Sequence, residues 1–276
     1  MNSGTHRPGP SPALLAEWDE VHDCIRERLQ GLLAGWDASL HLTEYLLGLR
    51  GYLRSPYLLT VWTPCPRTRR ELAWELTLHG LGMKLFDDLL DLDTDHDRYE
   101  LGYCLLMWHT ATRRLAHRTP DAVRLLEVLE REFVRIGTGQ VRAKRRPACD
   151  LAQWWSDAEH YSGSFQGCYA LLAALAGDVP EAAEHARTFG HSFGMITMVA
   201  DDLQDYRLKG EREGNLGHLL LTGRACAREL TTLLETARQQ AVVAAGQGCP
   251  SHDLTPVIDS YTHDVLERVL PSYVTG

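Results

Sequence analysis

The chain has 276 residues, of which 44% are hydrophobic and 24% are charged, as expected for a globular protein with a substantial core. Its formal net charge of −9 argues against nucleic acid or an anionic membrane surface as the main partner. No run of about 20 apolar residues occurs, which excludes a typical membrane-spanning helix.

The N-terminal segment and the cysteines point to a cytoplasmic protein. Residues 1–11 lack the apolar core of a signal peptide and are expected to form a disordered tail. The cysteines are odd in number and scattered, without a CxxC pair, which favours reduced thiols over disulfides or a zinc site. There are seven: Cys24, Cys65, Cys104, Cys149, Cys168, Cys226 and Cys249.

Helical periodicity runs through the rest of the chain, and sustained strand-like alternation is nearly absent. Proline- and glycine-containing breaks separate the periodic segments. The sequence therefore predicts one all-α helical bundle over residues 12–276. Its helices are expected at residues 12–34, 38–59, 68–93, 100–117, 120–144, 150–176, 180–207, 222–246 and 252–270.

The third expected helix carries an acidic cluster, Asp87, Asp88 and Asp91, within an otherwise apolar stretch. Residues four apart share a helix face, so Asp87 and Asp91 project together and Asp88 flanks them. Grouped carboxylates repel one another and resist burial unless a cation compensates. Hard oxygen ligands at this spacing suit Mg²⁺.

A second cluster repeats the pattern with Asp201, Asp202 and Asp205 on another apolar helix. One such motif is often only a solvated helix face, but two copies are more specific. Two carboxylate clusters facing across a bundle core would hold about three Mg²⁺ ions, which would stabilise the charge on a departing diphosphate.

Both motifs resemble those of the trans-isoprenyl diphosphate synthases, a family with the class I isoprenoid synthase fold. Supporting similarities extend over roughly residues 40–225: Glu75, His79, Gly139-Gln140, Tyr161-Ser162-Gly163-Ser164 and Gly194. The resemblance implies a helical bundle with a central active-site cavity, the six aspartates as catalytic metal ligands, an allylic isoprenoid diphosphate as substrate, and a homodimer.

The departures from this family concern the groups that bind isopentenyl diphosphate in its chain-elongating members. The N-terminal lysine is lost and only Arg54 is kept, and the paired arginines after the first motif are replaced by His96 and Asp97. Tyr161 replaces a lysine, and Thr197-Met198 replaces a phenylalanine-glutamine pair. Losing several charge-assisted contacts, each worth roughly 1.5–3 kcal/mol, should abolish binding of a second diphosphate.

An enzyme that ionises one diphosphate without an acceptor leaves the cation to react with its own double bonds. The chain is therefore interpreted as a class I terpene synthase, a carbon–oxygen lyase. Candidate substrate-binding residues are the cations near the motifs and side chains that would line a cavity: Arg54, Gly82, Met83, Phe86, Tyr161, Thr197, Met198, Arg207, Lys209 and Arg212. Further aromatic candidates for the lining are Trp108, Trp154, Trp155, Phe165 and Tyr169.

Tail length is inferred from the resemblance, in which bulky residues four and five positions before the first motif block long chains. Those positions are Met83 and Gly82. Gly80 lies nearby, and these small residues would leave room for a long tail. The room favours a C20 substrate, either geranylgeranyl diphosphate or a cyclic diterpenyl diphosphate, over C15 or C10.

Three alternatives stay open. The first is a prenyl diphosphate synthase with altered acceptor contacts, and the second is a regulatory subunit of such an enzyme. The third is a helical protein with an unrelated metal role.

Overall fold

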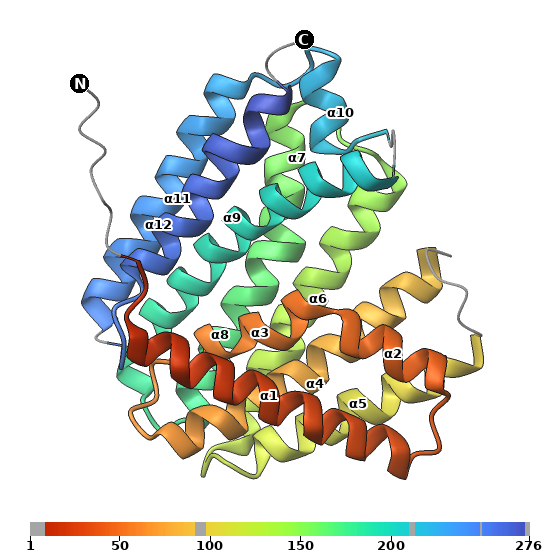
Figure 1. Ribbon diagram of the computed structural model, residues 1–276, viewed down its shortest axis with the longest axis vertical. Coiled ribbons are helices and arrows are strands. Elements are labelled where there is room, and N and C mark those ends of the chain that lie inside the picture. The colour runs from red at the N-terminus through yellow and green to blue at the C-terminus, as the bar shows by residue number, and fades with distance from the viewer. Residues whose placement is uncertain (1–8, 92–97, 210–212, 249, 274–276) are drawn as a thin grey trace. The chain divides into compact units, whose positions relative to one another are not determined.

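The computed structural model describes residues 9–91, 98–209, 213–248 and 250–273. Within these ranges every regular element is a helix and none is a strand, which confirms the predicted all-α fold (Figure 1). No described helix is both long and apolar enough to cross a membrane.

The chain divides into two compact units. The N-terminal unit comprises Ser11–Leu126 with Leu172–Pro180, and the C-terminal unit comprises mainly Glu127–Leu171 with Glu181–Gly276. Helices α6 (Ala122–Arg145) and α8 (Ser164–Ala176) contribute residues to both units. The expectation of a single domain over residues 12–276 stays a prediction.

The N-terminal unit begins with α1 (Pro12–Gly35), whose start follows from its sequence. Ser11 caps the helix by accepting a hydrogen bond from the Leu14 backbone N–H at 3.2 Å, and Pro12 occupies the first helical position. Its buried side chains recur every three or four residues and form one apolar face: Leu14, Trp18, Val21, Ile25, Leu29 and Leu33.

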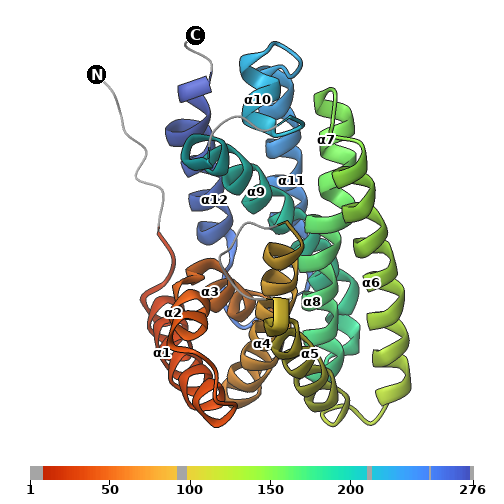
Figure 2. The ribbon, with the colours of Figure 1, turned by 90° about the vertical axis from the view of Figure 1, so that its right-hand side faces the viewer.

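The single helix expected at residues 38–59 is two helices, α2 (Leu40–Gly48) and α3 (Arg50–Leu58). Leu49 separates them with a ψ angle of 63°, which no α-helix tolerates. Beyond this break, α4 (Pro66–Asp91) packs along α5 (Leu101–Ala116), and a short 3₁₀ turn, η1 (Arg98–Glu100), precedes α5 (Figure 2). The first aspartate motif lies at the C-terminal end of α4.

The helix expected at residues 150–176 contains a π-helical turn, η2 (Glu159–Gly163), between α7 (Leu151–Ala158) and α8. Such turns often mark functional sites in helices. Two glycines of α9 (Ala183–Lys209) allow this segment to approach closely. A Cβ atom at Gly190 would lie 2.4 Å from the Gln166 carbonyl oxygen, and one at Gly194 would lie 3.0 Å from that of Ser162.

The rest of the C-terminal unit packs on α9. Helix α11 (Ala227–Gly248) lies alongside α9, and α12 (Thr255–Asp264) lies alongside α11 (Figure 1). The chain continues through η4 (Val265–Val269) to η5 (Leu270–Tyr273), where the Tyr273 hydroxyl donates a hydrogen bond to the Leu203 carbonyl. The short helix α10 (Leu216–Leu221) was not predicted, because six residues are too few to show a helical period.

Candidate functional site

The first motif is organised around Asp88, which is only 7% exposed. The Lys84 ammonium donates a hydrogen bond to Asp88 Oδ1 at 2.6 Å, and the Tyr45 hydroxyl donates one to Oδ2. Burial and the bond to Asp88 raise the pKa of Tyr45, so the phenol stays protonated. Burial opposes the charged form of Lys84, but Tyr52, Asp88 and Asp87 together raise its pKa. The Asp88 carboxylate is therefore held by the protein itself.

Of the other two aspartates in this motif, Asp87 is the one whose side chain the structure describes. Asp87 is partly buried, one residue before Asp88. Asp91 is the last residue of α4, and its side chain lies outside the described residues. The same holds for residues 92–97, which include His96 and Asp97.

Below the motif, Gly82 and Phe86 lie one turn apart on the side of α4 that meets α5. Trp108 of α5 packs here, with its ring centroid 5.3 Å from that of Phe86. Met83, partly buried, shares the Asp87 side of the helix. These residues were expected to line a cavity, and the structure places an aromatic pair among them.

Two further residues of the N-terminal unit are committed to structural contacts. The Arg54 guanidinium pairs with Asp19 at 2.7 Å and lies over the Trp18 ring at 4.9 Å. Burial lowers the pKa of His79 to about 4, so this histidine is neutral near pH 7. Arg54 is thus not an uncommitted cation, and His79 supplies no positive charge.

The second motif, on α9, is organised around Asp202. Its Oδ1 accepts a hydrogen bond from Asn215 Nδ2 at 2.9 Å. Its Oδ2 accepts bonds from Trp154 Nε1 at 2.9 Å and from the Leu216 backbone N–H at 2.6 Å. Burial raises the pKa of Asp202 to about 6 despite these donors, and the neighbouring charges of Asp201 and Asp205 act in the same direction.

These contacts give Asp202 an architectural task. Asn215 is the N-cap of α10, so the carboxylate fixes the start of that helix against α9 and α7. Asp201, by contrast, is exposed, and Asp205 is partly buried.

The substrate-binding residues predicted in the C-terminal unit are spread along η2 and α9. Tyr161 lies in the π-helical turn η2 and is partly buried. Thr197 accepts a hydrogen bond from Gln166 Nε2 at 3.0 Å and donates one to the Gly194 carbonyl at 3.1 Å. Met198, next to it, is partly buried. Thr197 is therefore joined to α8 one turn before Asp201.

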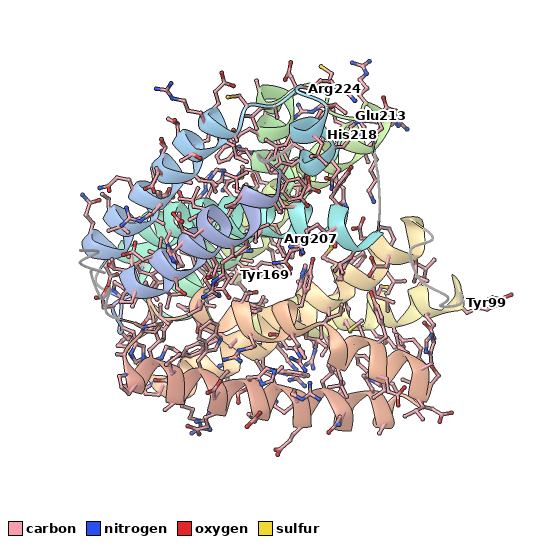
Figure 3. All side chains as sticks on the ribbon, turned by 45° about the horizontal axis from the view of Figure 1, so that its top comes forward. Tyr99, Tyr169, Arg207, Glu213, His218 and Arg224 are labelled. Atoms are coloured by element: carbon pink, nitrogen blue, oxygen red, sulfur yellow. The ribbon has the colours of Figure 1, made fainter. Side chains whose placement is uncertain are left out.

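The basic residues after the second motif can be placed only in part. Arg207 is exposed, whereas the Lys209 side chain and Arg212 lie outside the described residues. Figure 3 shows His218 and Arg224 beside each other near α10, with 2.5 Å between Arg224 Nη2 and His218 Nε2.

The remaining aromatic candidates of this unit belong to two groups of neighbouring rings. The Phe165 and Tyr169 rings are 4.4 Å apart, and the Phe133 ring lies 6.4 Å from Phe165. Trp154 and Trp155 are neighbours whose ring centroids are 6.3 Å apart. Tyr169 is buried, as expected for core packing of the group that contains Phe165.

The six aspartates are shared between the two units, three in each. Within the described part of the chain, no three His, Cys, Asp or Glu side chains are grouped closely enough to hold a metal ion. Convergence of the two motifs on one metal cluster therefore stays a prediction.

The side chains that hold the second aspartate of each motif were not predicted from the sequence: Tyr45, Lys84, Trp154 and Asn215. Lys84 had a signal, because it lies four residues before Asp88 on the same helix face. The other three come from distant segments and leave no local pattern.

No family model and no curated protein matches the sequence. Among solved structures, a polyprenyl synthase from Roseobacter denitrificans matches with a TM-score of 0.64 at 15% identity, covering 93% of this chain and 97% of that one. The chain has the isoprenyl diphosphate synthase fold.

Two other synthases of this fold match equally well. A geranylgeranyl pyrophosphate synthase from Lactobacillus brevis has a TM-score of 0.64 at 13% identity, with 93% of this chain and 98% of that one covered. An FPP/GFPP synthase from Zymomonas mobilis has a TM-score of 0.64 at 15% identity, with coverage of 90% and 99%. At these identities the likeness establishes the fold alone.

Proposed function

We propose that this protein ionises an allylic isoprenoid diphosphate with the help of Mg²⁺ and releases pyrophosphate. One observation carries the proposal: each DDxxD motif has its second aspartate held by protein donors. Asp88 is held by Lys84 and Tyr45, and Asp202 by Trp154, Asn215 and Leu216. Such anchoring fixes the neighbouring carboxylates in place, as a metal-binding motif requires.

The first aspartate of each motif, Asp87 or Asp201, is then the main candidate metal ligand, with Asp91 and Asp205 one turn further on. This donor set suits Mg²⁺, which keeps several waters and needs only one or two protein carboxylates beside phosphate oxygens. When bound, the ions would neutralise charge on the departing diphosphate. Asp88 and Asp202 serve as positioning residues.

The fate of the allylic cation decides between two activities. Chain elongation needs cations that hold a second diphosphate. Arg54, the only arginine kept from that segment, is engaged by Asp19 and Trp18, and His79 is neutral. These commitments favour reaction of the cation within its own carbon chain, which is the terpene synthase reaction.

Chain elongation is the second candidate. The solved structures of similar fold are named as prenyl or polyprenyl synthases, and none of those reported is named as a terpene synthase. Their names support elongation, whereas the contacts of Arg54 and His79 support cyclisation.

One experiment separates the two activities. The full-length protein is incubated with Mg²⁺ and geranyl, farnesyl or geranylgeranyl diphosphate, with and without isopentenyl diphosphate. Pyrophosphate and hydrocarbon products that form without isopentenyl diphosphate support a terpene synthase. A longer diphosphate that forms only with it establishes the elongating enzyme.

The same experiment also tests the proposal as a whole. If no substrate yields pyrophosphate above the level of an Asp201→Ala variant, the catalytic proposal fails. The protein would then be better explained as a regulatory subunit.

A further inference from the structure

A cavity of about 180 Å³ lies in the C-terminal unit, between α9, α11 and the segment formed by α7 and η2. All the residues that line it belong to this unit. Ser192 of its wall lies nine residues before Asp201 on α9, which is about two and a half helical turns. The two side chains therefore leave α9 on opposite sides, and the cavity is separate from the second aspartate motif.

The π-helical turn supplies the acidic group of this cavity, Glu159. The Glu159 carbonyl accepts the backbone N–H of Ser164, five residues further on, and also the Ser164 hydroxyl at 2.9 Å. One turn earlier, Trp155 Nε1 donates a hydrogen bond to Glu159 Oε1 at 3.2 Å. These contacts orient the carboxylate, and its second oxygen, Oε2, accepts no hydrogen bond from the described residues, so it can accept one from a ligand.

The facing wall, on α9, carries an imidazole without adding charge. A Cβ atom at Gly163 would lie 2.9 Å from His191 Nε2, so this glycine of η2 makes room for the ring. Burial lowers the pKa of His191, the charges of Arg135 and Arg187 lower it further, and the charge of Glu159 opposes them, so the ring is neutral at pH 7. Among the described residues that line the cavity, Glu159 alone carries a formal charge.

The rest of the wall combines a fixed amide with aliphatic side chains. Ser192 is only 1% exposed, and its hydroxyl donates a hydrogen bond to Oε1 of Gln240 on α11 at 3.3 Å. Met195, Leu233 and Ala237 add apolar surface. A negatively charged group beside such a surface suits a ligand with a cationic end and a hydrocarbon body.

From this arrangement we propose that the cavity is a second ligand site, which binds a small organic cation. Its ammonium group pairs with the Glu159 carboxylate beside the Trp155 ring, and its hydrocarbon body packs on Met195 and Leu233. The volume equals that of about six water molecules, which suits a ligand of about five to eight non-hydrogen atoms. This inference goes beyond the proposed catalytic function and does not depend on it.

The test uses isothermal titration calorimetry of the full-length protein at pH 7 and low ionic strength. Two probes of the same shape are compared, benzylammonium chloride and the neutral benzyl alcohol. We expect benzylammonium to bind at one site with a Kd of about 1 mM or lower, and benzyl alcohol to bind about tenfold more weakly or worse.

A Glu159→Gln variant removes the charge but keeps an oxygen that can accept the Trp155 hydrogen bond. It should weaken the binding of benzylammonium by about tenfold or more and leave that of benzyl alcohol unchanged. Thr236→Phe is the second variant. Thr236 lines the cavity but is exposed, so the fold should tolerate a larger side chain, which should reduce the binding of both probes.

Glu235→Gln is the matched control. This half-exposed carboxylate of α11 pairs with Arg238 at 3.5 Å and does not line the cavity. The same loss of charge at this position should leave the Kd of benzylammonium unchanged.

Three outcomes would overturn the proposal: no saturable binding of benzylammonium by the wild type, equal affinity for the two probes, or unchanged affinity in the Glu159→Gln variant. None of these measurements depends on pyrophosphate release. The ligand site and the proposed catalytic function can therefore fail independently of each other.

Discussion

The end of α4 and the end of α9 carry the same DDxxD pattern, yet the two helices satisfy it with different chemistry. Asp88 is held by an ammonium group, Lys84, together with Tyr45. Within the described residues, Asp202 is held by neutral donors, from Trp154, Asn215 and the Leu216 backbone. The first motif therefore carries its own counter-charge, whereas the pKa of Asp202 is raised by burial and by its acidic neighbours.

This difference indicates how strongly each motif depends on bound cations. A carboxylate cluster with an internal cation is partly neutralised before any metal binds, while one without it depends more on added cations. The origin of the partners also differs. Lys84 comes from the same helix as Asp88, but the partners of Asp202 come from α7 and the start of α10. Asp202 thus links the second motif to the packing of its unit.

The largest expected effect is on catalysis, and it distinguishes the first aspartate of each motif from the second. Asp87→Asn and Asp201→Asn should each reduce the rate of pyrophosphate release by about 10³-fold. Each substitution removes a charged ligand of the metal ions that are proposed to stabilise the transition state. Their free energies of unfolding should stay close to that of the wild type, most clearly for the exposed Asp201.

The control for this pair is Glu184→Gln. Glu184 is 78% exposed and lies at the start of α9, away from the motif. Its activity should equal that of the wild type. If Asp201→Asn also keeps full activity, α9 does not contribute the metal ligand proposed for it.

The second expected effect is on stability, and here Asp202 should matter more than Asp201. Asp202→Ala leaves the Trp154 and Leu216 donors without their acceptor and removes one of the two bonds of Asn215 Nδ2, which keeps the Asp202 backbone carbonyl. The free energy of unfolding should fall by about 3 kcal/mol. Asp201→Ala should change it by less than about 0.5 kcal/mol. Urea unfolding followed by circular dichroism measures both values, and equal stability of the two variants would remove the architectural role of Asp202.

The features of the fold that depend on local sequence signals were predicted correctly. The apolar period of α1 predicted that helix closely, and both aspartate motifs were correctly assigned to helices. The break at Leu49 and the π-helical turn at Glu159–Gly163 were not predicted, because the apolar period of the sequence continues on either side of each.

At the candidate site, the sequence did not predict which residues from distant segments contact the aspartates. The sequence shows that Asp202 is acidic, but not that Trp154 and Asn215 meet it from 48 and 13 residues away. Likewise, a glycine at position 82 reads as empty space until Trp108 is seen to fill it. Packing between helices, and not local propensity, decides both cases.

The next effect is confined to the first motif. Lys84→Met removes the cation from Asp88, which is nearly buried, and leaves Tyr45 as the partner of the carboxylate among the described side chains. The change should lower the free energy of unfolding by about 2 kcal/mol. Arg113→Met, at an exposed position of α5, is the control and should have little effect. A Lys84→Met protein as stable as the wild type would show that Asp88 needs no counter-charge, and the contrast between the two motifs would disappear.

The smallest effect compares two histidines that precede the motifs, His79 on α4 and His191 on α9. Burial lowers the pKa of His79 from 6.5 to about 4, so the unfolded chain binds a proton more readily than the folded one. The stability linked to His79 is therefore fully present above pH 6.5 and is lost as the pH falls through that value toward 4. Between pH 7.5 and 5.5 the loss amounts to about 1 kcal/mol.

A His79→Leu variant should lack this loss when unfolding free energies are measured at both pH values. Burial also lowers the pKa of His191; the charge of Glu159 acts against this shift, and those of Arg135 and Arg187 act with it. Because His191 is only partly buried, whereas His79 is buried, His191→Leu should remove less of the pH dependence. Because each variant is compared with itself at two pH values, its packing cost cancels. A larger change for His191 than for His79 would place the acid-sensitive core under the second motif instead of the first.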